Sequence, residues 1–252
     1  EAKWQTLFHR WSQRESFLVI PPVERQLSTK HVLVSAWEEG DHWRDVVQNW
    51  SDAERRQLAA KLVAFFHEGL FKLGAMHADW HPGNLRFRRD GSNVQLLLYD
   101  FGCVYAPDDG VRLGLMRLMQ AALTEHESPY PIFLALGFDS ELLDPIVTRL
   151  PALCRVLFEP YKAEYPYNLN DWSLGQRVDD ILGDDRWNFR IAGPPSLIFL
   201  IRAFHGLFFY VRGLNQAFLW KLIVESVLAP HRQEVAALQL PSVRTENTEF
   251  SD

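Results

Sequence analysis

The stretch from His77 to Gly102, HADWHPGNLRFRRDGSNVQLLLYDFG, decides the fold. It contains Asp79 and, five residues later, Asn84. Two apolar runs, LRFR and VQLLLY, then flank a polar turn, RDGSN, and the second run leads directly into Asp100 of an Asp-Phe-Gly triplet. Apolar runs on either side of an Asp-Gly turn are typical of a β-hairpin. The sequence therefore predicts a hairpin with acidic and amide side chains at its two ends.

These three polar residues have the spacing of a phosphoryl-transfer site. In kinase-like sites a first Asp orients a hydroxyl or water, while an Asn and a second Asp hold magnesium. Two carboxylates about 5 Å apart repel each other by roughly 3 kcal/mol at an effective dielectric constant near 20, and a divalent cation removes that repulsion. Oxygen ligands of this kind suit Mg²⁺. We therefore take Asp79, Asn84 and Asp100 as candidate catalytic residues, with Asn84 and Asp100 as the metal ligands.

The histidines of the same loop allow a rival interpretation. His77 and His81 flank Asp79 in a His-x-Asp-x-His pattern, which could present metal ligands for a hydrolase. No third His or Cys cluster accompanies them in the sequence. We therefore expect both histidines to structure the loop.

Composition narrows the class of protein. The chain has 252 residues, 47% of them hydrophobic, which is enough for a sizeable core. Its net charge of −6 disfavours nucleic acid as a partner, because no basic stripe is available to displace counterions. The short group Arg86, Arg88 and Arg89 is interpreted as a solvated strand edge.

Two features bear on localisation. Cys103 and Cys154 are far apart and lack metal-binding spacing, which favours a reducing, cytoplasmic compartment. The most apolar run, at 197–211, includes Arg202 and His205 and falls short of about 18 uninterrupted apolar residues, so we expect a buried helix there and not a membrane span. The chain begins with Glu1 and not Met, as a fragment would.

Helical periodicity dominates the chain outside the hairpin. Residues 1–18 have a helical spacing, and residues 31–37, HVLVSAW, predict a strand. Ser51 and Glu54 form a capping-box pattern before a long helix that ends near Gly74. Asp108-Asp109 can begin the next helix. Further helices are predicted near residues 129–137, 139–158, 172–182, 194–213 and 217–228.

The fold class follows from these elements. We predict an α+β protein with a protein-kinase-like fold, mainly its helical C-terminal lobe with a catalytic β-hairpin. The expected domains are a remnant of the N-terminal lobe and hinge at 1–40, the C-terminal lobe at 41–240, and a disordered tail at 241–252.

Three motifs in order resemble a known family. HADWHPGN followed by YDFG, together with the segments at 19–40 and 192–214, is similar to the UbiB/AarF/ADCK family of atypical, protein-kinase-like proteins. The resemblance implies Asp79 as the catalytic-loop Asp, Asn84 and Asp100 as magnesium ligands, and ATP and Mg²⁺ as cofactors. It also implies that the residues from Ala36 through Trp37 to Glu38 form the hinge beside adenine.

The resemblance has further implications and some departures. Glu1 resembles the helix Glu that pairs with the ATP-binding Lys, and that Lys, the Lys-x-Gly-Gln motif and the Ala-rich loop of the family are not in this sequence. Ala36 stands where the family has a hinge Glu, and Arg86 where an apolar residue lies under adenine. The family implies a role in ubiquinone or other isoprenoid-lipid metabolism. Its partners would be a nucleotide, an isoprenoid lipid or peripheral membrane surface, and other biosynthetic proteins.

Three functions remain open on the sequence. The first is a UbiB-type kinase or ATPase, inactive as this fragment and an enzyme as the full-length protein. The second is a small-molecule phosphotransferase of the aminoglycoside or choline type, which has a similar loop. The third is a pseudokinase that acts as a binding scaffold.

Overall fold

The computed structural model describes residues 1–241 and divides the chain into two compact units. The first unit comprises Glu1–Pro107, Glu159–Ser173 and Pro195–Pro230. The second comprises Asp108–Phe158, Leu174–Pro194 and, of the described residues, those from His231 to residue 241. The range 41–240, which was predicted as one lobe, contributes residues to both units. The predicted boundary at residue 40 lies inside the first unit. The predicted tail lies outside the described residues from residue 242 onward.

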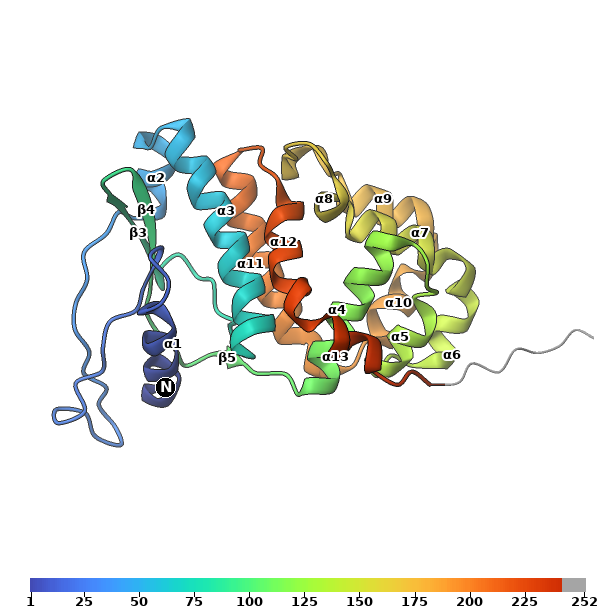
Figure 1. The fold of residues 1–252 in the computed structure, drawn as a ribbon, viewed down its shortest axis with the longest axis horizontal. Helices are drawn as coiled ribbons and strands as arrows, with labels where there is room; N and C mark the ends of the chain where they lie inside the picture. Colours follow the sequence, from blue (N-terminus) through green and yellow to red (C-terminus); the bar gives the residue numbers. More distant parts are fainter. Residues whose placement is uncertain (242–252) are drawn as a thin grey trace, which may run out of the picture. The chain divides into compact units, whose positions relative to one another are not determined.

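The first unit combines helices with short strands (Figure 1). Its strands form a three-stranded sheet in the order β1–β4–β3 and a two-stranded pair β2–β5. The strands are β1 (Leu18–Val19), β2 (Met76–His77), β3 (Leu85–Asp90), β4 (Asn93–Leu98) and β5 (Val104–Tyr105). The helices are α1 (Ala2–Ser12), α2 (Trp43–Asn49), α3 (Asp52–Glu68), α8 (Glu159–Lys162), α11 (Ile198–Leu214) and α12 (Trp220–Leu228).

The predicted hairpin is confirmed as β3 and β4. The two strands pair antiparallel, with Phe87 opposite Leu96 and Asp90 opposite Asn93. The two loop residues are therefore Gly91 and Ser92, one position later than the Asp90-Gly91 pair that the turn pattern indicated. Gly91 has a φ of 60°, which glycine adopts without the steric cost that a Cβ would add.

Helix α3 is the central support of the first unit. Its capping box is present as predicted: Ser51 N donates to Glu54 Oε2 at 2.7 Å, and Glu54 N donates to Ser51 Oγ at 3.3 Å. A π-helical turn, Gly69–Leu73, extends the helix to Gly74, where it was expected to end. The buried side chains of α3 contact β4, α11 and α12. This helix therefore joins the sheet to the C-terminal helices of the unit.

Aromatic rings fill the space between α1, α3 and the Asp-Phe-Gly segment. Phe8 of α1 is fully buried, and its ring centroid lies 5.1 Å from that of Phe101. Trp11 stacks on Phe65 at 5.5 Å, and Phe65 lies 5.8 Å from Trp80. Such ring pairs add packing energy beyond the burial of their area. The residues that carry the candidate site thus rest on a packed aromatic core.

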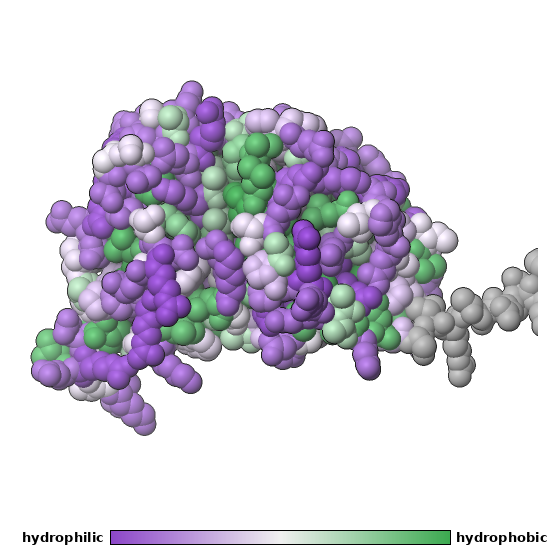
Figure 2. Space-filling model, viewed as in Figure 1, coloured by the Kyte–Doolittle hydropathy of each residue, from purple (hydrophilic) through white to green (hydrophobic). Residues whose placement is uncertain are grey.

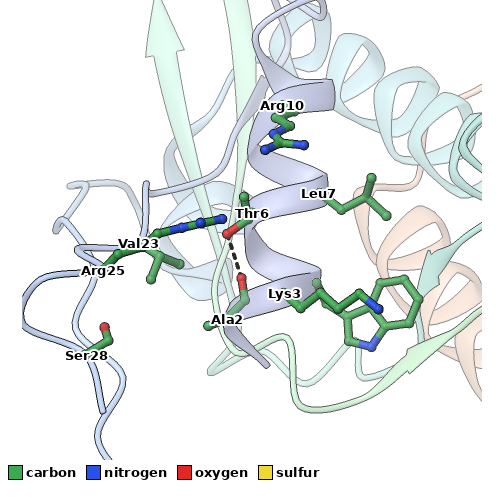
Figure 3. Close-up of a pocket in the computed structure, with 9 residues that line it drawn as sticks. Ala2, Lys3, Thr6, Leu7, Arg10, Val23, Arg25 and Ser28 are labelled. Atoms are coloured by element: carbon green, nitrogen blue, oxygen red, sulfur yellow. Dashed lines mark hydrogen bonds between the residues drawn. The ribbon is translucent and has the colours of Figure 1, made fainter. Parts of the chain in front are cut away.

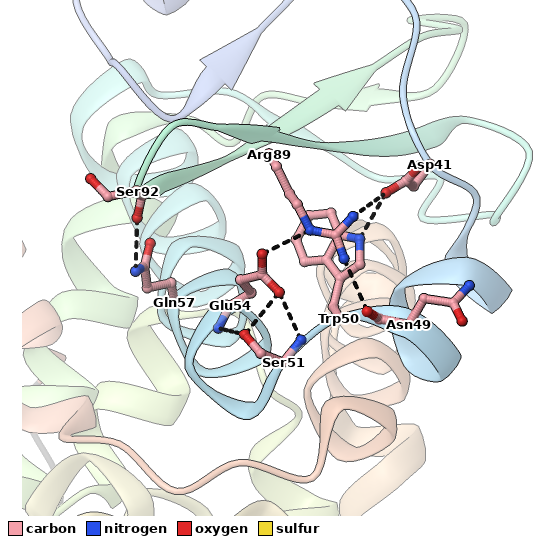
Figure 4. Close-up of polar contacts among 8 residues, drawn as sticks. All are labelled: Asp41, Asn49, Trp50, Ser51, Glu54, Gln57, Arg89 and Ser92. Carbon is pink, nitrogen blue, oxygen red and sulfur yellow. Dashed lines mark hydrogen bonds and ion pairs between the residues drawn. The ribbon is translucent and has the colours of Figure 1, made fainter.

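A polar network holds the hairpin to α2 and α3 (Figure 4). Arg89 of β3 donates to Glu54 Oε1 at 2.7 Å and to Asn49 O at 3.0 Å. Its guanidinium lies 4.9 Å from the Trp50 ring centroid, and Trp50 Nε1 donates to Asp41 Oδ2 at 2.7 Å. Arg89 lies on the edge strand β3 with its side chain 42% exposed, which agrees with the interpretation as a solvated strand edge. It also pairs with acids from segments distant in sequence.

The strand predicted at residues 31–37 does not form. Within residues 31–37 the one β-bridge joins Ser35 to Val23, and the rest of the run has no strand assignment. Glu24 N donates to Val34 O at 2.8 Å, and Ala36 N donates to Pro22 O at 3.0 Å. Whether an apolar run forms a strand depends on its neighbours. Residues 31–37 pair with a loop that contains Pro21 and Pro22, and not with a strand.

The second unit is helical, as predicted after Gly102. Its core consists of buried aliphatic and aromatic side chains, with Leu143, Ile146, Leu150 and Leu153 fully buried. The helices are α4 (Asp109–Thr124), α5 (Tyr130–Ala135), α6 (Ser140–Leu143), α7 (Leu150–Leu157), α9 (Leu174–Leu182), α10 (Arg186–Ala192) and α13 (Arg232–Ala237).

Two helix predictions in this region differ from the structure. The single helix expected at 139–158 is interrupted by a 3₁₀ segment, Asp144–Arg149, which contains Pro145. Proline removes a backbone donor and clashes with the preceding turn, so a continuous α-helix cannot pass through it. Helix α10 lies between the helices predicted at 172–182 and 194–213, where no helix was predicted.

Helix α11 is only partly buried, contrary to the expectation of a buried helix. Its side chains Ala203, Leu207 and Tyr210 are buried, whereas Ile198 and Ile201 are 62% and 52% exposed. One face packs on α3, and elsewhere on the helix the rings of Phe199 and Phe209 lie against those of Tyr105 and Trp43. By length and composition alone, Pro195–Leu214 could cross a membrane, and 33% of its apolar window is buried. Hydrophilic side chains cover most of the molecular face in Figure 2, with apolar areas between them.

Candidate functional site

Asp79 and Asn84 lie together in the loop between β2 and β3. Asn84 Nδ2 donates to Asp79 Oδ2 at 3.1 Å, and it lies 3.3 Å from Asp79 O. The amide nitrogen therefore faces Asp79, which leaves the Asn84 side-chain oxygen available as a ligand. The backbone fixes the same loop, because Asn84 N donates to His81 O and Tyr99 N donates to Asn84 O.

Asp100 follows β4 in a left-handed backbone conformation, with a φ of 54°. Few residues other than glycine adopt this region, and Asp and Asn are among the more tolerant. One carboxylate oxygen of Asp100 accepts from Gly102 N at 3.1 Å, and the side chain is exposed. Strained backbone of this kind occurs at functional sites. Here it turns the chain immediately after the strand.

His77 joins the two acid-bearing loops. Its Nε2 lies 2.7 Å from Asp100 O, and because a carbonyl can only accept, Nε2 carries the proton. Its Nδ1 then accepts from Asp79 N at 3.3 Å. Burial lowers the pKa of His77, and the neighbouring carbonyls and carboxylates oppose that shift. A neutral imidazole in one tautomer is therefore the form that links Asp79 to Asp100.

The structuring role expected for both histidines is confirmed. His81 Nδ1 accepts from Gly83 N at 3.0 Å, which closes the turn after Pro82. Among residues 1–241, no group of three or more His, Cys, Asp or Glu side chains is arranged to hold a metal. A hydrolase site built on His77 and His81 has no support in this part of the chain.

The donor set fits a hard cation. Asn84 offers a neutral amide oxygen, and Asp100 a carboxylate whose second oxygen has no hydrogen bond within the described residues. Mg²⁺ is commonly bound by one or two protein oxygens, with water and phosphate completing the octahedron. Asn84 and Asp100 thus offer the kinds of oxygen ligand that Mg²⁺ takes from proteins.

The predicted hinge residues are tied to the site through Tyr99. The Tyr99 hydroxyl donates to Glu38 O at 2.5 Å, and the Trp37 ring stacks on the Tyr99 ring at 5.6 Å. Burial raises the pKa of Tyr99, so its hydroxyl remains a donor. The Glu38 carboxylate pairs with Arg88 at 2.9 Å, and Trp37 is 74% exposed. The residue preceding Asp100 therefore anchors the segment that contains Ala36, Trp37 and Glu38.

Among residues 1–241, no contact of the Glu1 side chain connects it to Asp79, Asn84 or Asp100. It precedes α1, its carbonyl accepts from Gln5 N at 3.0 Å, and its carboxylate makes no capping hydrogen bond. Its expected pairing with a lysine stays a prediction.

A pocket of about 490 Å³ lies elsewhere, between α1 and the loop at residues 23–28 (Figure 3). Lys3, Arg10 and Arg25 are among its lining residues, and in Figure 3 the Lys3 side chain points away from Arg25. Asp79, Asn84 and Asp100 are not among the residues that line it. This pocket is therefore distinct from the candidate site.

Arg202 is a site residue that the sequence motifs did not reveal. Its Nη2 donates to Asp79 Oδ1 at 2.6 Å. The arginine lies on α11, 123 residues beyond Asp79, inside the run that was interpreted as apolar core. A charged residue interrupting an apolar helix was the one sequence signal that could have identified it.

Comparisons with known proteins agree on the family. Residues 1–129 match the model of the ABC1 atypical kinase-like domain. The AarF domain-containing protein kinase 1 of Xenopus tropicalis is 32% identical over 111 residues, which cover 43% of this chain and 21% of that protein. The corresponding protein of Mus musculus is 29% identical over 110 residues, 42% of this chain and 21% of that protein. The matched regions thus span about a fifth of the length of these relatives.

A solved structure has the same fold. The complex of Rv3197 with erythromycin from Mycobacterium tuberculosis superposes with a TM-score of 0.70 at 20% identity, covering 90% of this chain and 56% of that one. The α+β, protein-kinase-like fold with a helical lobe is thereby confirmed. With the family match over residues 1–129, these findings show that the chain belongs to the ABC1 (UbiB/AarF/ADCK) family of atypical kinase-like proteins.

Proposed function

We propose that this chain carries the catalytic and magnesium-binding residues of an atypical, ATP-dependent kinase or ATPase. The observation that supports the proposal most is the pair of loops joined by His77. One loop presents Asp79 and Asn84, and the other presents Asp100. An ABC1 family match and relatives described as kinases point the same way.

Each residue has a distinct task in this proposal. Asp79 accepts a hydrogen bond from the attacking hydroxyl or water and orients it toward the phosphoryl group. Asn84 and Asp100 hold Mg²⁺, which when bound would neutralise charge on the phosphate oxygens. His77 keeps both loops in register. The segment of Ala36, Trp37 and Glu38 borders the adenine.

The test uses the natural polypeptide that contains these residues and four variants. Asp79→Asn should retain the rise in melting temperature that Mg²⁺ and ATP produce, and lose roughly 100-fold or more in ATP turnover. Asp100→Asn and Asn84→Ala should lose the magnesium-dependent rise itself. Asp180→Asn, an exposed position in α9, is the control and should change neither readout.

The contrary result is equally clear. If ATP binds equally well with Asp100→Asn and Asn84→Ala, the assignment of the magnesium ligands is wrong. Retained biological activity in an Asp79→Asn, Asp100→Asn double variant would favour a pseudokinase scaffold. Phosphorylation of a soluble aminoglycoside or choline-like alcohol would favour a small-molecule phosphotransferase.

We also propose a cytoplasmic protein that contacts a membrane peripherally and supports ubiquinone or other isoprenoid-lipid metabolism. The exposed apolar side chains Ile198, Ile201 and Phe209 of α11 support the membrane contact. Co-sedimentation with phospholipid vesicles, compared between the natural protein and an Ile198→Ser, Ile201→Ser variant, tests it. Equal co-sedimentation of the two would contradict a contact through α11.

A further inference from the structure

Arg202 makes an ion pair with Asp79 that local packing builds into the fold. Trp80, the residue next to Asp79, is buried and donates from Nε1 to His77 O at 2.8 Å. Gly206 of α11 lies so close to Trp80 that a Cβ at position 206 would be 2.2 Å from the Trp80 Cβ. Residues four apart share one face of a helix. The contact at Gly206 therefore places Arg202, one turn earlier, toward the same loop.

The ion pair completes a fixed environment for the Asp79 carboxylate. Arg202 Nη2 donates to one oxygen at 2.6 Å, and Asn84 Nδ2 donates to the other at 3.1 Å. One donor comes from the loop and one from α11, so rotation of the carboxylate breaks at least one bond. Each oxygen has two lone pairs. A substrate hydroxyl can therefore still bind to Asp79 while both donors remain.

This pair is poorly explained as a device for stability. The Arg202 side chain is 55% exposed and that of Asp79 is 28% exposed. Ion pairs exposed to this degree contribute little to folding. Within the described residues Arg202 makes this one hydrogen bond, through one of its five N–H donors.

We propose that Arg202 is a positioning residue of the phosphotransfer site, which holds the Asp79 carboxylate in the orientation that accepts the substrate hydroxyl. The inference rests on the function proposed above for Asp79. The guanidinium acts through Asp79, and its geometry as a donor matters in addition to its charge. Arg202 belongs to the site although it lies beyond the residues 1–129 of the family match.

The experiment is a double-variant cycle in ATP turnover, measured in the natural polypeptide. Arg202→Met should lower turnover by roughly tenfold to a hundredfold, because misplacing a reacting group by about 1 Å has that effect. The loss should fall on kcat more than on KM, with the Mg²⁺-and-ATP rise in melting temperature retained. Arg202→Lys should recover part of the turnover. In the Asp79→Asn background, Arg202→Met should produce no further loss.

Arg212→Met is the matched control and should leave ATP turnover unchanged. Arg212 is an exposed arginine of the same helix, and its Nε donates to Asn170 Oδ1 at 3.1 Å, away from the loop. Suppose that turnover depends on Asp79. If Arg202→Met then keeps turnover within twofold of wild type, the inference about Arg202 is wrong and the proposed function still stands. The same holds if the losses of the two single variants multiply in the double variant. Turnover that survives Asp79→Asn, or its complete absence in the natural protein, would overturn the proposed function and this inference with it.

Discussion

At the residue scale, His67 makes the stability of the first unit sensitive to pH. It is 1% exposed on α3, where its Nδ1 donates to Val63 O at 2.7 Å. Burial lowers the pKa of His67 from 6.5 to about 4. Between these values the unfolded state binds the proton and the folded state does not, so stability falls as the pH decreases. We expect roughly 3 kcal/mol of unfolding free energy to be lost from pH 7 to pH 4 through this residue.

Urea unfolding at pH 7 and pH 5 measures the effect of His67. His67→Phe, which keeps an aromatic ring against Phe71 and Tyr161, should reduce the difference between the two midpoints. His77, whose pKa burial also lowers, should leave a residual dependence of the same sign. An unchanged difference in His67→Phe would mean that the pKa of this imidazole is the same in the folded and unfolded states.

At the element scale, the close approach of α11 to the catalytic loop limits position 206 to glycine. Gly206→Ala should destabilise the protein by about 1–3 kcal/mol, because the added Cβ meets the Trp80 Cβ, which cannot move aside as a flexible chain end can. Gly175→Ala is the matched control in α9. Its Cβ meets no atom within 4 Å, and alanine there should be neutral or stabilise by about 0.5–1 kcal/mol. Denaturant titration of both variants measures the contrast, and equal effects would contradict the packing of α11 on Trp80.

At the scale of the whole molecule, Cys154 reports the opening of the second unit. It is 3% exposed, and burial raises the pKa of its thiol to about 12, so the reactive thiolate is scarce in the folded state. Cys103, which is partly exposed in the first unit, should react first with a thiol reagent. Leu153→Ala removes a fully buried neighbour and should speed Cys154 labelling by roughly 30-fold or more. An unchanged labelling rate would show that Cys154 reacts without opening of this core.

The sequence predicted the parts of the fold that local patterns specify. The capping box at Ser51, the long helix behind it and the hairpin all depend on residues within a few positions of one another, and all are confirmed. The helix at 139–158 and the strand at 31–37 failed for different reasons. Pro145 interrupts the helix, and the apolar run has no neighbouring strand to pair with.

For the candidate site, too, the sequence predicts the contacts between residues that are close in the chain. The spacing of Asp79 and Asn84 placed both in one loop, where they are hydrogen-bonded to each other. The two histidines structure that loop as expected. Arg202 could not be found this way, because its partner is remote in sequence and its helix has an apolar composition. The link between Glu38 and Tyr99 is likewise a product of tertiary structure.

The three-part make-up of the first unit has a consequence for synthesis on the ribosome. Phe66 of α3 packs against Phe204 of α11, and Trp80 packs against Gly206. At roughly 5–20 residues per second, α11 emerges several seconds or more after α3 and the loop that bears Asp79. Throughout that interval the aromatic rings that pack against α11 are exposed on the nascent chain. We therefore expect holdase chaperones to bind it before translation reaches α11.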